Sequence, residues 1–467
     1  METLRHCLPP SVRRTLNELP ESLDETYERI LGEIKKPNRE HAHRVLQCLV
    51  VAIRPLRVEE LAEVFAVDFD NEGIPKLKPD WRWGDQEQAL LTSCSSLIVI
   101  VKSGGVRIVQ FSHFSVKEFL TSSRLGTSSG HTSRYHIVLE PAHTILAQAC
   151  MSVLLRLEGH AWGVSHSSPL ARYAAEHWVA HAQNENVSPC VRKAMEYLFD
   201  LDKPYFAAWL QLYDIDTSAR AGSKHRTFTS RSKYDATPLY YAALCGFQDL
   251  VEHLTVNNPE QVNATGGYFV IPLVAALAAG HFQTAKFLHD NGAHPNIRGK
   301  AGTTPLLTAA YNGDFEMVRV LLEYKADVNA RHTRGWTSLH LASHGNPSLG
   351  PNITPLFSNV AQLLLEHGAD INAKATSHSA STPLHIAAQQ GRVGVVYVLL
   401  QNGANVSMKD DRGRTALQMA SDRGHVDVMK LLSLSEHLTG QGHVVASRPM
   451  PTSSLHLPLL GNPTSYR

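Results

Sequence analysis

The chain has 467 residues, of which 43% are hydrophobic and 19% charged, and its formal net charge is +1. This length predicts roughly two to four domains, and the small net charge excludes a general electrostatic affinity for nucleic acid or anionic membranes. No apolar run reaches the roughly 18 residues of a membrane-spanning helix, and the N-terminus lacks a signal-peptide core. The six cysteines lie at least 40 residues apart, without a CxxC pair. We therefore expect reduced, mostly buried thiols and a cytoplasmic location, with the nucleus as the alternative.

The N-terminal part is predicted to be a helical segment over 1–36 followed by a winged-helix-like domain over 37–125. A capping-box pattern at Ser22–Glu25 begins the helical segment. Three helices and a β-hairpin then follow in the order of a winged helix. The expected helices cover about His41–Ile53, from Val58 to Phe65, and about Gln86–Ser93; the strands are Leu97–Val101 and Val106–Phe111; a closing helix covers Ser115–Ser122.

Winged helices often bind DNA through the helix that precedes the hairpin, which then offers Arg, Lys or Asn to the major groove. Here that helix begins with the acidic run Asp85-Gln86-Glu87. We therefore predict a structural or regulatory domain with no nucleic-acid partner, and DNA binding remains the alternative.

A helical region is predicted over 139–214, followed by a basic linker over 217–233. His177 and His181 have the spacing of a zinc pair, but Trp178 stands where a metalloprotease helix has Glu, and spacing indicates no third ligand. We expect a partly exposed histidine pair and no metal. Residues 126–130 match the GxSxG pattern, but an expected helix precedes them where the motif needs a strand, so no catalytic residue is assigned. The linker is interpreted as a solvated hinge, with an import signal or anion contact as the alternative.

Residues 234–432 repeat with a period of 33, interrupted by one 12-residue insertion. The signature reads TTPLLTAA at 303–310 and STPLHIAA at 381–388, and a second signature reads HGADIN at 367–372. This period and these motifs are those of the ankyrin repeat, and about six units are present. Thr304 and Thr382 are placed to cap helices, and Pro305 and Pro383 occupy the first helical position. We interpret His340 and His385 as structural groups that order the turn.

Ankyrin arrays bind proteins, so we expect a protein ligand on the concave helix faces and finger tips. Aromatic and arginine side chains supply many interface hot spots. The candidate protein-binding residues are Tyr240, Arg331, His332, Arg334, Trp336, Asp411, Arg412 and Arg414. We expect no catalytic residue, cofactor, metal, membrane contact or small-molecule substrate.

Three further segments carry a family resemblance. The runs LNELPESLDETYERIL at 16–31, RPLRVEELAE at 54–63 and FSHFSVKEFL at 111–120 resemble the region that follows the nucleotide-binding NACHT domain in fungal NOD-like receptors. The run YAAEHW at 173–178 is similar to the next helical block of that family. The resemblance covers roughly residues 10–432, and it implies a sensor and relay role in signalling or non-self recognition.

The sequence departs from that family because it contains no GxxxxGK[ST] phosphate loop; its one Gly-Lys pair, Gly299-Lys300, lacks the required neighbours. Two hypotheses remain: a non-enzymatic interaction protein, or a fragment of a longer nucleotide-dependent switch whose P-loop domain lies upstream. The predicted fold is mainly α, with winged-helix-like and helical regions before an ankyrin solenoid and a disordered tail over 437–467.

Overall fold

The computed structural model describes residues 23–69, 74–127, 131–157, 168–216, 236–299, 302–347, 354–376 and 380–440. The chain divides into two compact units, Met1–His294 and Pro295–Arg467. The linker over 217–233, most of the GxSxG match, the centre of the repeat insertion and the tail from residue 441 lie outside the described residues.

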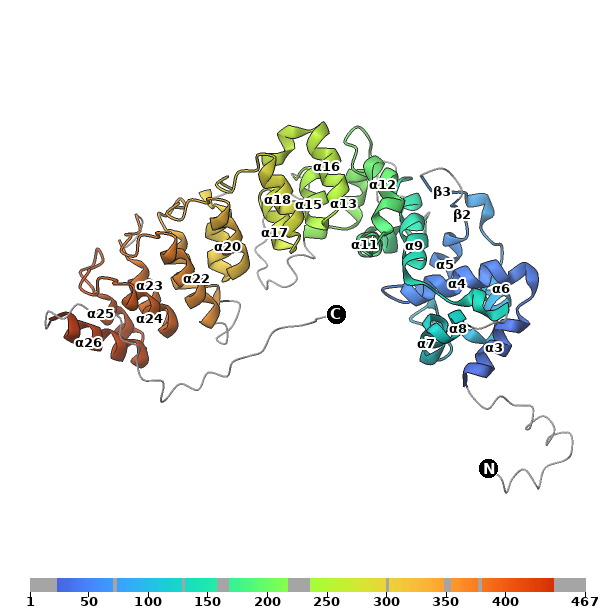
Figure 1. The fold of residues 1–467 in the computed structure, drawn as a ribbon, viewed down its shortest axis with the longest axis horizontal. Coiled ribbons are helices and arrows are strands. Elements are labelled where there is room, and N and C mark those ends of the chain that lie inside the picture. The colour runs from blue at the N-terminus through green and yellow to red at the C-terminus, as the bar shows by residue number, and fades with distance from the viewer. Residues whose placement is uncertain are drawn as a thin grey trace, which may run out of the picture. The chain divides into compact units, whose positions relative to one another are not determined.

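The first unit begins with a winged helix (Figure 1). Its three-stranded antiparallel sheet has the order β1-β5-β4, and β4 pairs with β5 from Ile98–Phe111 to Ser103–Val106. The helices and strands are α3 Leu23–Glu33, α4 Arg39–Val51, β1 Leu56–Arg57, α5 Val58–Val64, β2 Val67–Asp68, β3 Lys76–Leu77, α6 Gln86–Cys94, β4 Ile98–Ser103, β5 Val106–Phe111, α7 Phe114–Thr121 and α8 Ser123–Thr127. The predicted winged helix is therefore present, together with a strand, β1, that the sequence did not indicate.

Four helices form a helical block after the winged helix: α9 Leu139–Leu154, α11 Ala171–Ala182, α12 Val187–Leu198 and α13 Tyr205–Leu212. The first two repeats complete the unit with α15 Pro238–Cys245, α16 Gln248–Asn257, α17 Pro272–Ala278 and α18 Phe282–Asp290. Aromatic rings join the block to the first repeat. Trp178 of α11 stacks on Phe247 at 5.2 Å and 21°, and Phe206 of α13 meets the Tyr241 ring at 5.7 Å. The helical block therefore shares its core with the repeats and covers the first of them.

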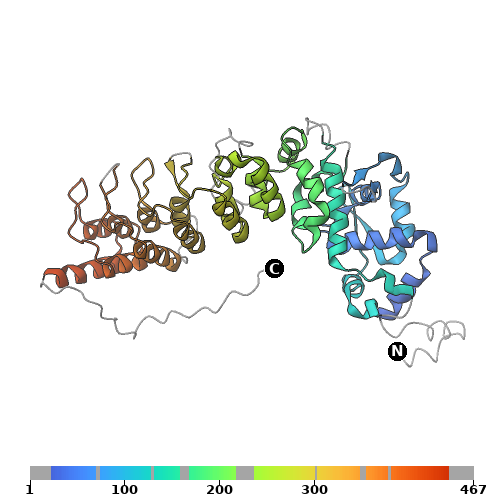
Figure 2. The same cartoon turned by 45° about the horizontal axis from the view of Figure 1, so that its top comes forward.

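The second unit contains four more helix pairs whose connecting loops project to one side of the stack (Figure 2). They are α19 Pro305–Asn312 with α20 Phe315–Glu323, α21 Ser338–His344 with α22 Thr354–Glu366, α23 Pro383–Gln389 with α24 Val393–Gln401, and α25 Ala416–Asp422 with α26 Val426–Gly440. The mainly helical fold with its winged helix and ankyrin repeats is thus confirmed. The last helix, α26, extends to Gly440, so the first residues of the predicted disordered tail are helical. The other domain boundaries stay predictions.

None of the helices in the described part of the chain is long and apolar enough to cross a lipid bilayer. The thiols of Cys48, Cys94, Cys150 and Cys245 are free and buried, whereas Cys190 is free and exposed.

Candidate functional site

We call the loop between one helix pair and the next a finger, and the first helix of each pair the inner helix. In the second unit, the histidines of the repeat signature hold the fingers to the inner helices. The Nδ1 of His340 accepts a hydrogen bond from the Thr337 backbone N–H (3.2 Å), and its Nε2 donates to the Ser381 carbonyl oxygen (3.0 Å). His385 makes the same pair of contacts with the Thr382 N–H and the Arg414 carbonyl oxygen. Burial lowers the pKa of His340 to about 4, so the ring is neutral at pH 7. The structural role predicted for these histidines is confirmed.

Arginine side chains connect successive fingers through hydrogen bonds to backbone carbonyl oxygens. The Arg298 guanidinium donates to the carbonyl oxygen of Arg331 (2.7 Å). One finger later, Arg331 donates to the carbonyl oxygens of Lys374 (2.7 Å) and Gly335 (3.0 Å). Arg331 therefore orders the row of fingers on which the other candidate residues lie. Carbonyl oxygens carry no formal charge, so these contacts leave the positive charge of both arginines uncompensated.

Four half-buried rings form a ladder on this face, which we call the ring ladder: Tyr311, His344, Trp336 and His332. Tyr311 stacks on His344 at 6.2 Å and 21°. The Trp336 indole lies 5.6 Å from the His344 ring and 6.1 Å from the His332 ring. Trp336 comes from a finger, whereas Tyr311 and His344 lie in the last turns of the inner helices α19 and α21. Two of the predicted residues, His332 and Trp336, thus belong to one cluster, and Arg334 lies exposed between them in sequence.

Three of the predicted residues, Asp411, Arg412 and Arg414, lie on the last finger. Arg414 binds the buried Asp410 carboxylate through Nε and Nη2 (3.1 and 3.0 Å). Burial alone would raise the pKa of Asp410, but hydrogen bonds from Arg414 and from the Arg412 backbone hold it below its usual value. Arg414 therefore makes structural hydrogen bonds within the chain, as Arg331 does. Asp411 and the Arg412 side chain are exposed.

Tyr240 is not available as a surface contact. Its side chain is fully buried in the first unit. The Tyr240 hydroxyl donates to the Asp216 carboxylate (2.7 Å) and accepts from the Phe269 N–H (3.2 Å). The prediction for this residue was wrong because the end of the helical block, at Asp216, folds over the first repeat.

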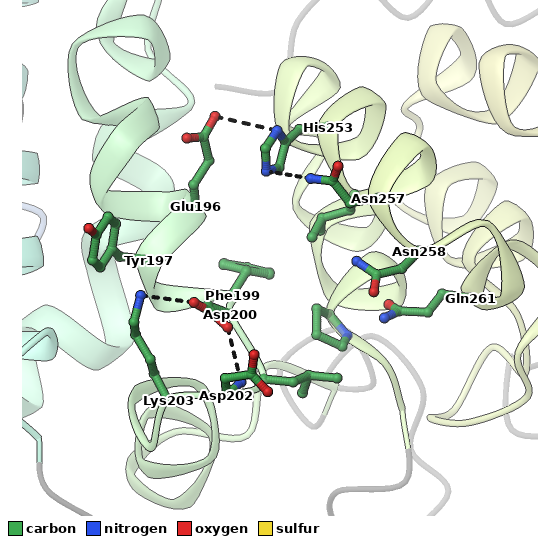
Figure 3. A pocket seen from close by; sticks show the side chains of 13 residues that line it. Glu196, Tyr197, Phe199, Asp200, Asp202, Lys203, His253, Asn257, Asn258 and Gln261 are labelled. Carbon is green, nitrogen blue, oxygen red and sulfur yellow. Dashed lines mark hydrogen bonds and ion pairs between the residues drawn. The ribbon is translucent and has the colours of Figure 1, made fainter.

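The first unit also contains a cleft of about 560 Å³ between α12 and α16 (Figure 3). Several of the charged groups that line it contact one another. Glu196 faces His253 (3.9 Å), and Asp200 binds Lys203 (2.8 Å). The Lys203 ammonium also lies 3.6 Å from the centre of the Tyr197 ring. Because these groups satisfy one another, we assign no ligand to the cleft.

In the winged helix, the arginine of the wing, Arg107, binds two carboxylates and stays partly exposed. Arg107 of β5 binds Glu87 of α6 (3.0 Å) and also Glu59 of α5. These hydrogen bonds raise the pKa of Arg107. Arg107 is therefore engaged by two carboxylates of its own domain, and the absence of a nucleic-acid partner stays a prediction.

The histidine pair of α11 is packed in the protein. His177 is partly exposed, as predicted, but His181 is fully buried, so the prediction of a partly exposed pair was wrong for it. His181 contacts the Tyr173 hydroxyl (2.8 Å) and the His143 ring (2.9 Å). Burial lowers the pKa of His181 to about 3. Over the described ranges, no three His, Cys, Asp or Glu side chains form a metal-binding group.

Comparison with known proteins identifies two domain families in this chain. Residues 273–375 and 357–441 match the family described as ankyrin repeats (3 copies). Residues 27–132 match the winged helix domain of GPI inositol-deacylase. Ankyrin repeats and a winged-helix domain are therefore present, and ankyrin repeats of this kind support a protein–protein interaction module.

Among similar proteins is the azaphilone pigments biosynthesis cluster protein L of the fungus Monascus ruber, which is 32% identical over 296 residues. That match covers 60% of this chain and 61% of the relative. Cyclin-dependent kinase 4 inhibitor B of Homo sapiens is 39% identical over 71 residues, 15% of this chain and 51% of that protein. The probable E3 ubiquitin-protein ligase XBOS34 of rice is 37% identical over 86 residues, 18% of this chain and 17% of that protein.

Proposed function

We propose that this chain is a non-catalytic protein-binding module whose partner docks on the ring ladder and the adjacent finger tips of the second unit. The observation that carries the proposal is the ladder itself, because four half-buried rings converge on a face that the repeats leave accessible. Interface hot spots favour aromatic and arginine side chains that a partner can desolvate. Trp336 and the exposed Arg334 fit that description.

Within this proposal, the chain acts as the sensor and relay part of a fungal NOD-like receptor in signalling or non-self recognition, in the cytoplasm or the nucleus. The order of a winged helix, a helical block and ankyrin repeats supports this role, and the relative from Monascus ruber supports a fungal origin. The four buried free thiols support a reducing compartment. The alternative is a longer nucleotide-dependent switch with a P-loop domain upstream. Mapping the 5′ end of the native transcript tests this alternative. An in-frame GxxxxGK[ST] segment before Met1 would make the chain the sensor half of a nucleotide-dependent switch, whereas a message that starts just before Met1 would make it a stand-alone binding protein.

The docking face is tested by affinity capture with three versions of the chain: wild type, Trp336→Ala combined with Arg334→Ala, and Trp81→Ala. Trp81 is an exposed tryptophan of the winged helix, so its variant controls for the loss of an indole. Proteins captured by wild type should also be captured by Trp81→Ala and be lost from the double variant. An unchanged capture profile for the double variant would contradict docking at the ladder.

A further inference from the structure

Two arginines near the ring ladder, Arg331 and Arg392, have no ion-pair partner among the described residues. Arg392 is half-buried beside His344 of the ladder, and its Nη2 donates to the His344 carbonyl oxygen (3.2 Å). Its guanidinium also lies 4.9 Å over the Phe357 ring. Within the described parts of the second unit, no carboxylate lies at ion-pair distance from Arg392 or Arg331. A half-buried cation without an anionic neighbour is unfavourable unless a bound group supplies the charge.

Few carboxylates lie near these arginines in the described fingers. Asp327 and Asp370, near the start of two fingers, accept hydrogen bonds from the backbone N–H groups of Asn329 and Asn372 (3.0 Å each). The buried Asp410 is held by Arg414. In the described residues of these fingers, the four cations Arg298, Arg331, Arg334 and Lys374 outnumber the two carboxylates of Asp327 and Asp370, so the finger tips around the ladder carry an excess of positive charge.

The ladder also restricts what can pack against it. The Trp336 ring lies within 25° and 27° of parallel to the rings of His332 and His340, at 6.1 and 6.2 Å. Part of the indole surface is therefore already engaged inside the chain. A nucleic-acid base needs an open ring face for stacking, whereas an aliphatic or aromatic side chain packs well against a ring edge.

We propose that the ring ladder receives an acidic linear segment of a partner protein, with one apolar or aromatic side chain on Trp336 and flanking carboxylates on the arginines around it. This inference rests on the proposed docking function and adds the chemical class of the partner. Arginine guanidinium groups bind carboxylates through paired N–H donors, so the flanking carboxylates fix the position of the apolar side chain. The interaction is screened by salt because the finger tips are exposed.

A selection from phage-displayed random linear peptides of about 12 residues, performed on the full chain, tests the inference. The enriched sequences should be net acidic and contain an apolar or aromatic residue. Their affinities are then measured by fluorescence anisotropy on wild type, Trp336→Ala, Arg334→Glu and Arg319→Glu. Arg319 is the matched control because it lies on the outer helix α20, paired with Glu316 and Glu323.

We expect Trp336→Ala and Arg334→Glu each to weaken binding about tenfold or more, and Arg319→Glu to change it less than about threefold. Raising salt from about 50 mM to about 500 mM should weaken wild-type binding about tenfold. Enriched peptides that are neutral or basic but depend on Trp336 would refute the acidic partner and leave the docking face intact. Acidic peptides that bind Trp336→Ala as well as wild type would refute the face itself. No enrichment, or tighter binding of a uridine 20-mer RNA than of any peptide, would refute a linear peptide ligand.

Discussion

Replacing Trp178 with alanine should destabilise the helical block and the first two repeats together. The side chain is fully buried. It packs on Phe247 of the first repeat at 5.2 Å, on Trp209 at 5.4 Å and on Phe199 at 6.3 Å. Removing a buried tryptophan lowers the free energy of unfolding by about 3 to 5 kcal/mol, and part of that loss comes from aromatic pairs worth about 0.5 to 1.5 kcal/mol each.

Hydrogen exchange measured by mass spectrometry resolves where the loss occurs. If the block and the repeats share one core, amides of α15–α18 should exchange faster in Trp178→Ala along with those of α11–α13. Trp178→Phe keeps a ring against Phe247 and should lose much less stability. In Trp81→Ala, which removes a half-exposed indole, the change should stay below about 1 kcal/mol. Unchanged protection of α15–α18 in Trp178→Ala would refute the shared core.

Three further predictions follow from buried polar groups and backbone geometry. Tyr240→Phe leaves the buried Asp216 carboxylate without its hydroxyl donor, so urea unfolding should show a loss of about 1 to 3 kcal/mol; an unchanged midpoint would contradict this. The pKa of the His340 side chain is 6.5 in the unfolded chain and about 4 in the folded chain. Between these pH values only the unfolded chain gains a proton. The free energy of unfolding should therefore fall by up to about 1.4 kcal/mol per pH unit as the pH drops from 6.5 to 4. His340→Gln should make that decline shallower, and an identical slope would contradict the assignment. At Gly335 (φ +75°), an added Cβ would lie 2.5 Å from the Thr376 backbone nitrogen. Gly335→Ala should therefore lower the melting temperature and weaken peptide binding that depends on the ladder. A melting temperature equal to that of wild type would refute this argument from backbone strain.

Much of the fold was predictable because helices and repeats have strong periods. The helix expected at about His41–Ile53 is α4, Arg39–Val51, and the expected hairpin is β4 and β5. Strand β1, Leu56–Arg57, was missed because two residues are too few to show an alternating pattern. The C-terminal extension of α26 was missed because the repeat motif stops before the helix does.

The site was less predictable because it depends on neighbours from other fingers. The sequence analysis named Arg331 and Arg414 as candidate protein-binding residues. In the structure each makes hydrogen bonds within the chain, to a residue of another finger or to one four residues away. Tyr240 resembled an exposed repeat residue, and its burial depends on the fold of the helical block over it. The repeat pattern alone does not indicate that Tyr240 is buried.

The proposed docking face uses other positions of the repeat than those that set the fold. Positions that set the fold recur, such as the capping threonines, because every unit needs the same helix start. The ladder comes from positions that break the repeat: Trp336 stands two residues before its helix, where the neighbouring units have Thr303 and Ser381. Tyr311 and His344 are 33 residues apart at one repeat position, so an aromatic ring at the same place in two consecutive units was a signal present in the sequence. Because adjacent units stack, side chains that are one period apart become neighbours on one face. Deviations that coincide in consecutive units therefore indicate a binding surface more directly than the conspicuous residues of any single unit.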